Sequence, residues 1–137
     1  MAAYSFSVIG VLVLCLLSIL LAIHSGSSKG RAGALSGPVL PADDDNLLYR
    51  IDRVHMNAVE ALPPFVVASV LAMMVRVSAG ALATLVWVYV AIRLIHVVVY
   101  LRGGKAAKGG NIRTILYVSG ALVNVVLIAT TAVATIR

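Results

Sequence analysis

A stripe of polar residues opens an otherwise apolar segment, and its residue types are those that bind ligands or assist catalysis. Arg50, Arg53, Asn57 and Glu60 are spaced so that all four fall on one face of an α-helix. A charged side chain within a bilayer costs roughly 2.5–3.5 kcal/mol on insertion scales. A chain that keeps several of them on one stripe is therefore predicted to use them for binding or chemistry.

Two further apolar segments carry polar faces at helical spacing. They hold Arg93, His96 and Tyr100, and Arg113, Tyr117, Gly120 and Asn124. At about 1.5 Å of rise per residue, Glu60 and Arg93 reach a similar depth, about 15 Å and about 12 Å from the same membrane surface. An isolated charge there is costly, so we expect an ion pair between them. The other polar residues are predicted to form a cup with excess positive charge: Arg53, Asn57, His96, Tyr100, Arg113 and Tyr117.

Each of these residues also has a purely structural interpretation. Arg50 can reach the headgroups with its long side chain, and the Glu60–Arg93 pair can serve packing alone. His96 can be an interior histidine with satisfied hydrogen bonds, and the two tyrosines can belong to an interfacial aromatic belt. What favours a site is that three segments present polar groups at the same level.

The chemistry of the cup suits a small polyanion. Arg53 and Arg113 can grip carboxylates through paired hydrogen bonds, while tyrosine and asparagine add neutral ones. Three scattered histidines without a second ligand one turn away do not make a zinc or iron motif. The cup contains no cysteine, so any thiol chemistry requires a thiol brought by a cosubstrate.

Composition predicts an integral membrane protein. The chain is 61% hydrophobic and 12% charged, against about 45–50% and about 25% in soluble domains. Its 137 residues are predicted to form a single domain, an all-α, four-helix antiparallel membrane bundle. The expected spans are residues 4–23, 48–75, 81–101 and 113–136. No basic residue precedes the first span and no small-residue cleavage site follows it, so a retained helix is expected rather than a signal peptide.

The connecting segments set the expected orientation. Residues 24–46 are rich in glycine, proline and serine, which predicts a loop, and its end at 43–46 offers several N-caps for the second helix. Eight basic residues lie in or beside the two connections 24–53 and 102–113, against two, Arg76 and Arg137, at the opposite ends of the spans. The positive-inside rule therefore places both connections in the cytoplasm and both termini outside. The net charge of +6 is explained by this distribution and needs no nucleic-acid partner.

The motif Arg53-x-x-x-Asn57-x-x-Glu60-x-x-Pro63-x-Phe65 resembles the MAPEG family, the membrane-associated proteins in eicosanoid and glutathione metabolism. Arg93-x-x-His96-x-x-x-Tyr100 and Arg113-Thr114-x-x-Tyr117 extend the resemblance. The pattern is most similar to the branch of microsomal prostaglandin E synthase and its bacterial relatives. The likeness covers roughly residues 5–135.

The resemblance implies a homotrimer that binds glutathione between neighbouring subunits, near the cytoplasmic side. Glutathione would be held by Arg53, Asn57, Glu60, Arg93, His96, Tyr100 and Tyr117. Glu60 would accept the α-amino group of glutathione, which competes with its expected pairing to Arg93. Arg113 would face the thiol, with Thr114 where some relatives have serine. Arg31 or Lys29 would reach a glutathione carboxylate from the neighbouring subunit.

The activity expected from this resemblance is glutathione-dependent transfer to, or peroxide reduction of, a lipophilic electrophile entering from the lipid. Met56 stands where the prostaglandin synthase branch has an arginine, and the connection between Tyr100 and Arg113 is longer than in some relatives. With these two differences, isomerase activity stays an open alternative to transfer and peroxide reduction. Two further alternatives remain: a glutathione- or lipid-binding membrane protein without turnover, and a small four-helix exporter. Such exporters usually centre an acidic residue in the first helix, and residues 4–23 have none.

Overall fold

Helices form over the long apolar stretches because a helix satisfies its own backbone hydrogen bonds inside lipid. The structure, a computed structural model, describes residues 2–34, 41–103 and 111–136. A short 3-10 turn at Ala2–Tyr4 precedes the first α-helix. The helices are α1 (Ser5–Arg31), α2 (Leu47–Met74), α3 (Ala79–Arg102) and α4 (Asn111–Ile136). All four are long and apolar enough to cross a membrane, which confirms the prediction of a four-span, all-α chain.

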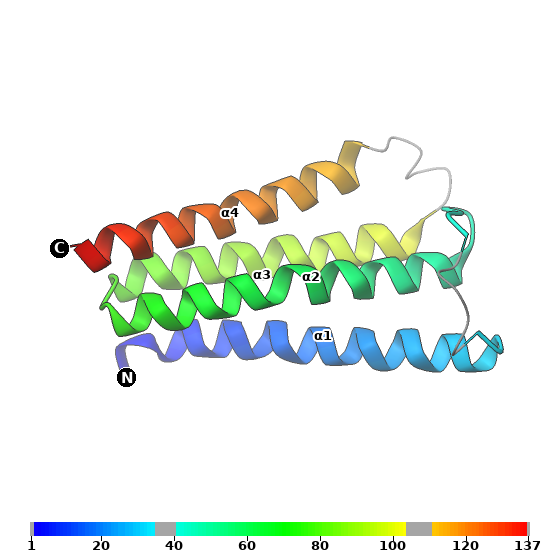
Figure 1. Cartoon of the computed structure of the whole chain (residues 1–137), viewed down its shortest axis with the longest axis horizontal. Coiled ribbons are helices and arrows are strands. Elements are labelled where there is room, and N and C mark those ends of the chain that lie inside the picture. The colour runs from blue at the N-terminus through cyan, green and yellow to red at the C-terminus, as the bar shows by residue number, and fades with distance from the viewer. Residues whose placement is uncertain (1, 35–40, 104–110, 137) are drawn as a thin grey trace.

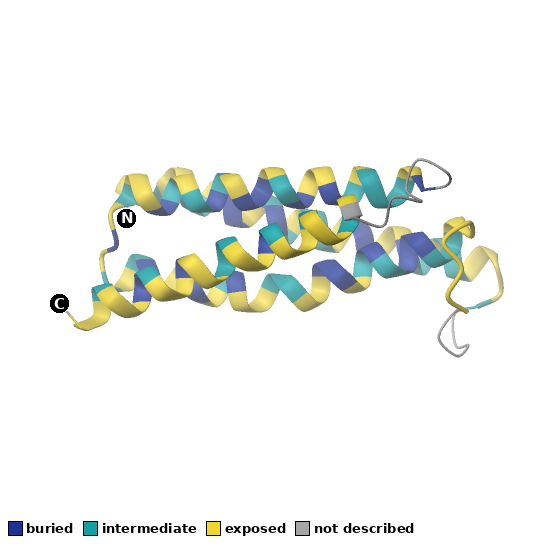
Figure 2. Ribbon diagram, turned by 90° about the horizontal axis from the view of Figure 1, so that it is seen from above, coloured by how far each residue is buried: buried dark blue, intermediate teal, exposed yellow. Residues whose placement is uncertain are grey.

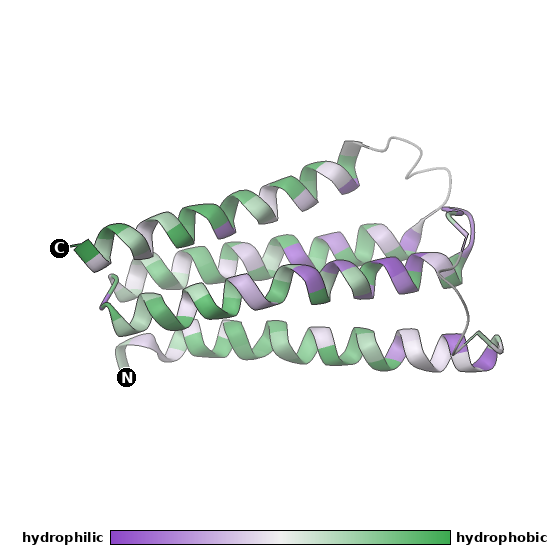
Figure 3. Ribbon diagram, in the orientation of Figure 1, coloured by the Kyte–Doolittle hydropathy of each residue, from purple (hydrophilic) through white to green (hydrophobic). Residues whose placement is uncertain are grey.

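The four helices run antiparallel, and both chain termini lie at the same end (Figure 1). The helices α2 and α3 each contact all the others, while α1 and α4 flank them. Figure 1 also shows α4 inclined to the other three. We call the end where α1 and α3 finish the polar end, because hydrophilic residues gather there (Figure 3), and the end with both termini the apolar end.

The first helix is longer than predicted, and the expected loop over residues 24–46 is wrong in its first part. Residues 24–31 are helical, with Gly26 and Gly30 inside α1. The helix ends at Arg31, and Gly33 just beyond it has a φ of +68°, which allows the N–H of Ala34 to bond to the carbonyl of Lys29 at 2.9 Å. Such a left-handed turn is a common helix stop. The two extra helical turns of residues 24–31 also contact α2, and the composition of this segment does not reveal those contacts.

Those contacts centre on Asp52, a buried carboxylate of α2. Ser25 Oγ donates to Asp52 Oδ1 at 3.2 Å, and Lys29 forms an ion pair with the same oxygen. A buried charge must be paired to be tolerated. The end of α1 is therefore fastened to α2 at the polar end of the bundle.

The second helix begins at one of the predicted caps. The side chain of Asn46 accepts a hydrogen bond from the N–H of Leu48 at 2.9 Å. The helix continues to Met74 with Pro63 and Pro64 inside it. The turn to α3 occupies residues 75–78, because α3 already begins at Ala79.

The packed core lies between the helices, and their outer faces are exposed (Figure 2). Phe65 and Tyr89, both almost fully buried, stack with ring centroids 3.9 Å apart. Trp87 donates from its indole N–H to the carbonyl of Phe6 at 3.2 Å. Exposed leucines, isoleucines and valines on every helix are the surface expected to face lipid.

Candidate functional site

The predicted polar faces of α2, α3 and α4 surround one pocket at the polar end. The pocket has a volume of about 470 Å³, within the range of roughly 300–1,000 Å³ common for small-molecule sites. Its lining residues are Asp44, Tyr49, Arg53, Asn57, Glu60, His96, Tyr100, Arg113, Thr114 and Tyr117. The expected cup of six polar residues is thus brought together in space.

The wall from α2 consists of four residues on one helical face. Tyr49, Arg53, Asn57 and Glu60 all line the pocket, spaced by four, four and three residues. Asn57 is buried, Arg53 is half-buried and Glu60 is exposed. The guanidinium of Arg53 has no ion-pair partner within the described ranges, so its donors remain available to a ligand.

The wall from α3 is aromatic. His96 is 2% exposed, and its ring lies 5.4 Å from that of Tyr100, one turn later. The Nδ1 atom of His96 is buried without a hydrogen-bond partner among the described residues. A buried polar atom without a partner is costly, so the fold leaves one nitrogen unsatisfied at a residue that lines the pocket.

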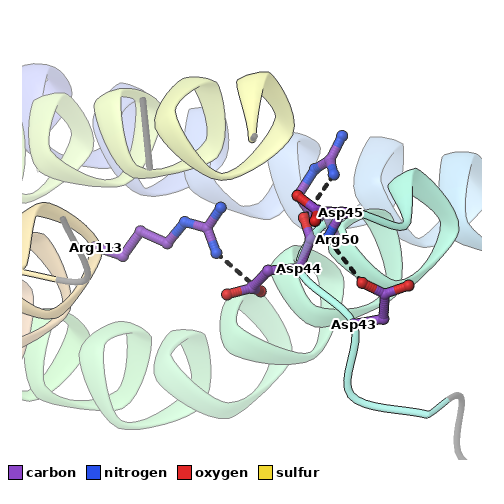
Figure 4. Close-up of polar contacts among 5 residues, drawn as sticks. All are labelled: Asp43, Asp44, Asp45, Arg50 and Arg113. Carbon is purple, nitrogen blue, oxygen red and sulfur yellow. Dashed lines mark hydrogen bonds and ion pairs between the residues drawn. The ribbon is translucent and has the colours of Figure 1, made fainter. Parts of the chain in front are cut away.

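The wall from α4 is dominated by Arg113. Its Nη1 atom donates to Asp44 Oδ1 at 3.0 Å (Figure 4), and its guanidinium carbon lies 4.5 Å from the centroid of the Tyr100 ring. The Nε and Nη2 atoms are buried and have no partner in the described part of the chain. Arg113 is therefore held on one side and carries unused donors on the other. Thr114 and Tyr117, both exposed, line the pocket beside it.

The predicted ion pair between Glu60 and Arg93 is wrong. Arg93 is 5% exposed, and its Nη2 atom donates to the main-chain carbonyl of Asn57 at 2.6 Å. Among the described residues neither Glu60 nor Arg93 takes part in an ion pair. Arg93 also does not line the pocket with Glu60; it borders a much smaller cavity among Leu14, Leu17, Ser18, Ala58, Leu62 and Tyr89. Arg93 thus supports the backbone of α2 from behind, and Glu60 remains free to accept a hydrogen bond.

Three other predicted residues lie outside the pocket. Arg50, on the original stripe, is buried and bonded to the carbonyl of Asp44 at 2.7 Å. Arg31 is exposed at the end of α1, and Lys29 is paired with Asp52. Within this single chain, neither residue of α1 lines the pocket.

Sequence reasoning missed two lining residues. Tyr49 lies one turn before Arg53, so helical spacing would have found it. Asp44 belongs to the acidic run 43–45, for which the sequence predicts only caps of the second helix. Its partner Arg113 is 69 residues away, and the spacing of residues within the run carries no sign of that contact.

The pocket therefore presents both donors and acceptors to a ligand. Arg53 and Arg113 offer guanidinium groups that suit carboxylates or a sulfur anion. Glu60 offers a carboxylate that suits an ammonium group. A small molecule with two or more negative groups and one positive group matches this arrangement.

The fold and the pocket define a protein of four membrane-spanning helices with a polar pocket between α2, α3 and α4. The model of the MAPEG family matches residues 3–133, nearly the whole chain, and the protein belongs to that family. No curated protein and no solved structure matches it. Membership suggests an integral membrane protein with a glutathione-related function.

Proposed function

We propose that this protein is a membrane glutathione transferase that acts on lipophilic electrophiles, with glutathione peroxidase activity as a variant of the same chemistry. The observation that carries the proposal is Arg113, which lines the pocket and whose Nε and Nη2 atoms are buried without a partner among the residues that the structure describes. Family membership supports glutathione as the ligand. The motif from Arg53 to Phe65 as a whole suggests the prostaglandin E synthase-like and bacterial branch within the family, with Met56 as a departure from it.

The residues of the pocket match the groups of glutathione, which is a substrate here. Arg53 suits one of its carboxylates and Glu60 its ammonium group. Asn57, His96, Tyr100 and Tyr117 supply neutral hydrogen bonds, and Arg93 holds the backbone at Asn57 from the side away from the pocket. These assignments leave Arg113 for the sulfur.

Arg113 would act by stabilising the thiolate of glutathione. A free thiol has a pKa of about 8.5, and a neighbouring guanidinium lowers it. Thr114, the next residue, would donate a hydroxyl hydrogen bond to the same sulfur. With an aryl halide, a carbon–sulfur bond forms and the carbon–halogen bond breaks, the halide leaving with the electron pair. The proton released by the thiol passes to solvent.

Peroxide reduction would use the same pocket. The sulfur bonds to one oxygen of a lipid hydroperoxide as the O–O bond breaks, and the other oxygen leaves as an alcohol after protonation. A second glutathione thiol then displaces water to give glutathione disulfide. Arg113 again stabilises the sulfur anion before attack.

We further propose a homotrimer in which the pocket is completed by a neighbouring subunit. Glu60 is exposed and Tyr117 is 45% exposed although both line the pocket, so one side of the site is open in a single chain. Arg31, at the end of α1, would reach it from the next copy. Native mass spectrometry in detergent tests the stoichiometry, and a monomer that binds glutathione at full affinity would contradict this assembly.

The polar end would face the cytoplasm, because Lys29, Arg53, Arg102 and Arg113 lie at that end. Single cysteines placed in 35–40 or at the termini, on a Cys15→Ala background, would test this by labelling with an impermeant maleimide in intact cells. Labelling at the termini but not in 35–40 is expected.

The function is tested by titrating the purified protein with glutathione in a calorimeter and by assaying conjugation to an aryl halide. We expect saturable binding and turnover. In Arg113→Ala we expect turnover to fall about 10²–10³-fold, while S-methylglutathione, which has no ionisable thiol, binds equally well to both forms. Binding without conjugation of any electrophile in a broad panel would instead indicate a glutathione-binding protein. Absence of saturable binding would overturn the proposal.

A further inference from the structure

Arg50 is a buried cation that the proposed mechanism does not use. It is 8% exposed, yet no carboxylate pairs with it within the described ranges. Its Nη1 atom donates to the main-chain carbonyl of Asp44 at 2.7 Å, and its Nε atom is buried without a described partner. Burying a guanidinium without a carboxylate partner is costly, so the position of Arg50 calls for an explanation.

The end of α3 is shaped to admit Arg50. Gly103, which follows α3, has a φ of +46°, and a Cβ atom built there would lie 2.2 Å from Arg50 Nε and 2.3 Å from its Cζ. Only glycine leaves room for the guanidinium and takes this backbone angle without strain. Arg50 therefore connects the start of α2 with the end of α3.

The group that Arg50 holds is the backbone of Asp44, and the side chain of Asp44 holds Arg113 (Figure 4). The carboxylate is 68% exposed and the guanidinium 11%. A carboxylate this exposed, on a segment free to move, would contribute little to an ion pair. Fixing its main chain from behind removes much of that freedom.

Arg113 is consequently held by two groups. Asp44 binds Nη1 at 3.0 Å, and the Tyr100 ring lies against the guanidinium at 4.5 Å. Within the described ranges Nε and Nη2 have no partner. A guanidinium is planar, so fixing one edge and one face sets the direction of the remaining donors.

We infer that Arg50 is a positioning residue for the site: seated over Gly103, it fixes Asp44, which in turn aims Arg113 at the sulfur of the substrate. This inference rests on the proposed role of Arg113. Arg50 does not line the pocket, so it would not contact the substrate. Its effect is on the geometry of the donor that stabilises charge, and a small misplacement of such a group can cost up to about a hundredfold in rate.

The test compares Arg50→Met, Asp44→Asn and the double variant. Kinetics with glutathione and an aryl halide give kcat and KM, and an ultraviolet titration gives the pH at which bound glutathione ionises. We expect each single variant to lower kcat roughly ten- to a hundredfold, with KM for glutathione changed about twofold or less because Arg53, Asn57 and Glu60 remain. Ionisation of the bound thiol should move to higher pH.

Coupling provides the sharper readout. Because both residues act through one chain of contacts, the double variant should be no worse than the worse single variant. Arg50→Lys should restore part of the loss, since an ammonium group can donate to the same carbonyl. Arg102→Met is the matched control: Arg102 is an exposed arginine at the same end of α3, and its loss should leave kcat and KM unchanged.

A merely structural Arg50 predicts a different result. The midpoint of unfolding and glutathione affinity would fall together in Arg50→Met, the thiol would ionise at the wild-type pH, and the two substitutions would add. That result overturns the positioning role. Failure of the proposed function is separate: it is a wild-type protein without saturable glutathione binding. In that case hydrogen exchange at residues 43–46 in Arg50→Met still shows whether Arg50 holds this segment.

Discussion

The two ends of the bundle treat their polar groups in opposite ways. At the apolar end, Ser69 Oγ and Thr131 Oγ1 donate to carbonyls four residues earlier in their own helices, each at 2.8 Å. At the polar end, His96 Nδ1 and two nitrogens of Arg113 are buried without partners in the described part of the chain. Ser7 Oγ is an exception at the apolar end.

The cavities of the two ends differ in the same way. A groove of about 560 Å³ runs between α2 and α4 toward the apolar end, and its lining includes Val67, Leu71 and Ile128. The pocket of the polar end, of about 470 Å³, is lined mostly by charged and hydrogen-bonding side chains. The comparison teaches that the apolar end mostly satisfies its hydrogen bonds within the chain and stabilises the fold, whereas the polar end keeps hydrogen-bonding groups for a ligand. Substitutions in the two halves should therefore affect different measurements.

The largest effect is expected from Phe65→Ala on the free energy of unfolding. Phe65 is fully buried and stacked on Tyr89, and truncating a buried phenylalanine typically costs about 3–5 kcal/mol. Equilibrium unfolding in mixed detergent micelles measures the loss. Val70→Ala is the control, because Val70 is 46% exposed and should change stability by well under about 1 kcal/mol. Equal losses in the two variants would contradict the idea of a packed apolar half.

The next effect is on ligand affinity rather than on stability. Arg53→Met removes a cation of the pocket that lacks an ion-pair partner in the described ranges. Losing a hydrogen bond to a charged group costs about 1.5–3 kcal/mol, or roughly ten- to a hundredfold in the Kd for glutathione. Calorimetric titration measures this change, while the unfolding midpoint should stay near that of wild type. Arg76→Met, at the other end of the chain's second span, should leave the Kd unchanged.

Two glycines in the helices sharpen the comparison because they should respond with opposite sign. A Cβ atom at Gly10 would fall 2.4 Å from Cγ1 of Val86, whereas one at Gly120 would meet its nearest neighbour, Tyr89, at 3.6 Å. Gly10→Ala should therefore lose about 1 kcal/mol of stability through overpacking. Gly120→Ala should gain about 0.5–1 kcal/mol from reduced backbone entropy of the unfolded chain. Paired unfolding curves decide this, and a loss in Gly120→Ala would show that α4 packs more tightly than the structure indicates.

An effect of similar size is expected at the start of α2. Asn46→Ala removes the side-chain acceptor for the N–H of Leu48 and should cost about 1 kcal/mol. Fraying of this turn should also weaken glutathione binding a few-fold, because Tyr49 and Arg53 follow within two turns. Asn46→Ser keeps a capping oxygen and should preserve both properties. Wild-type affinity in Asn46→Ala would show that the cap serves the fold alone.

Much of the fold was predictable because the membrane makes strong demands on composition. An apolar stretch of about 20 residues has almost no alternative to a helix in lipid, so four spans follow from the residues themselves. Where α1 ends did not follow. Gly26 and Gly30 resemble loop residues in composition, but Ser25 and Lys29 gain Asp52 as a partner only when α1 and α2 are side by side.

For the candidate site, the sequence predicted which helix faces carry the polar residues, but not which partner each polar side chain has. Helical spacing alone aligned Arg53, Asn57 and Glu60, and it would have included Tyr49. The partner of Arg93 is a main-chain carbonyl, which every residue possesses, so no side-chain pattern could indicate it.

What the sequence by itself determined is the set of helices and the face of each that carries polar groups, since both depend on neighbours within about 20 residues. Only the tertiary structure decided which charges meet. Asp44 rather than Glu60 reaches an arginine, and Arg50 lies over Gly103 instead of in the pocket. The physical reason is that ion pairing falls off over a few ångströms, and distances of that size between helices are set by how the helices pack.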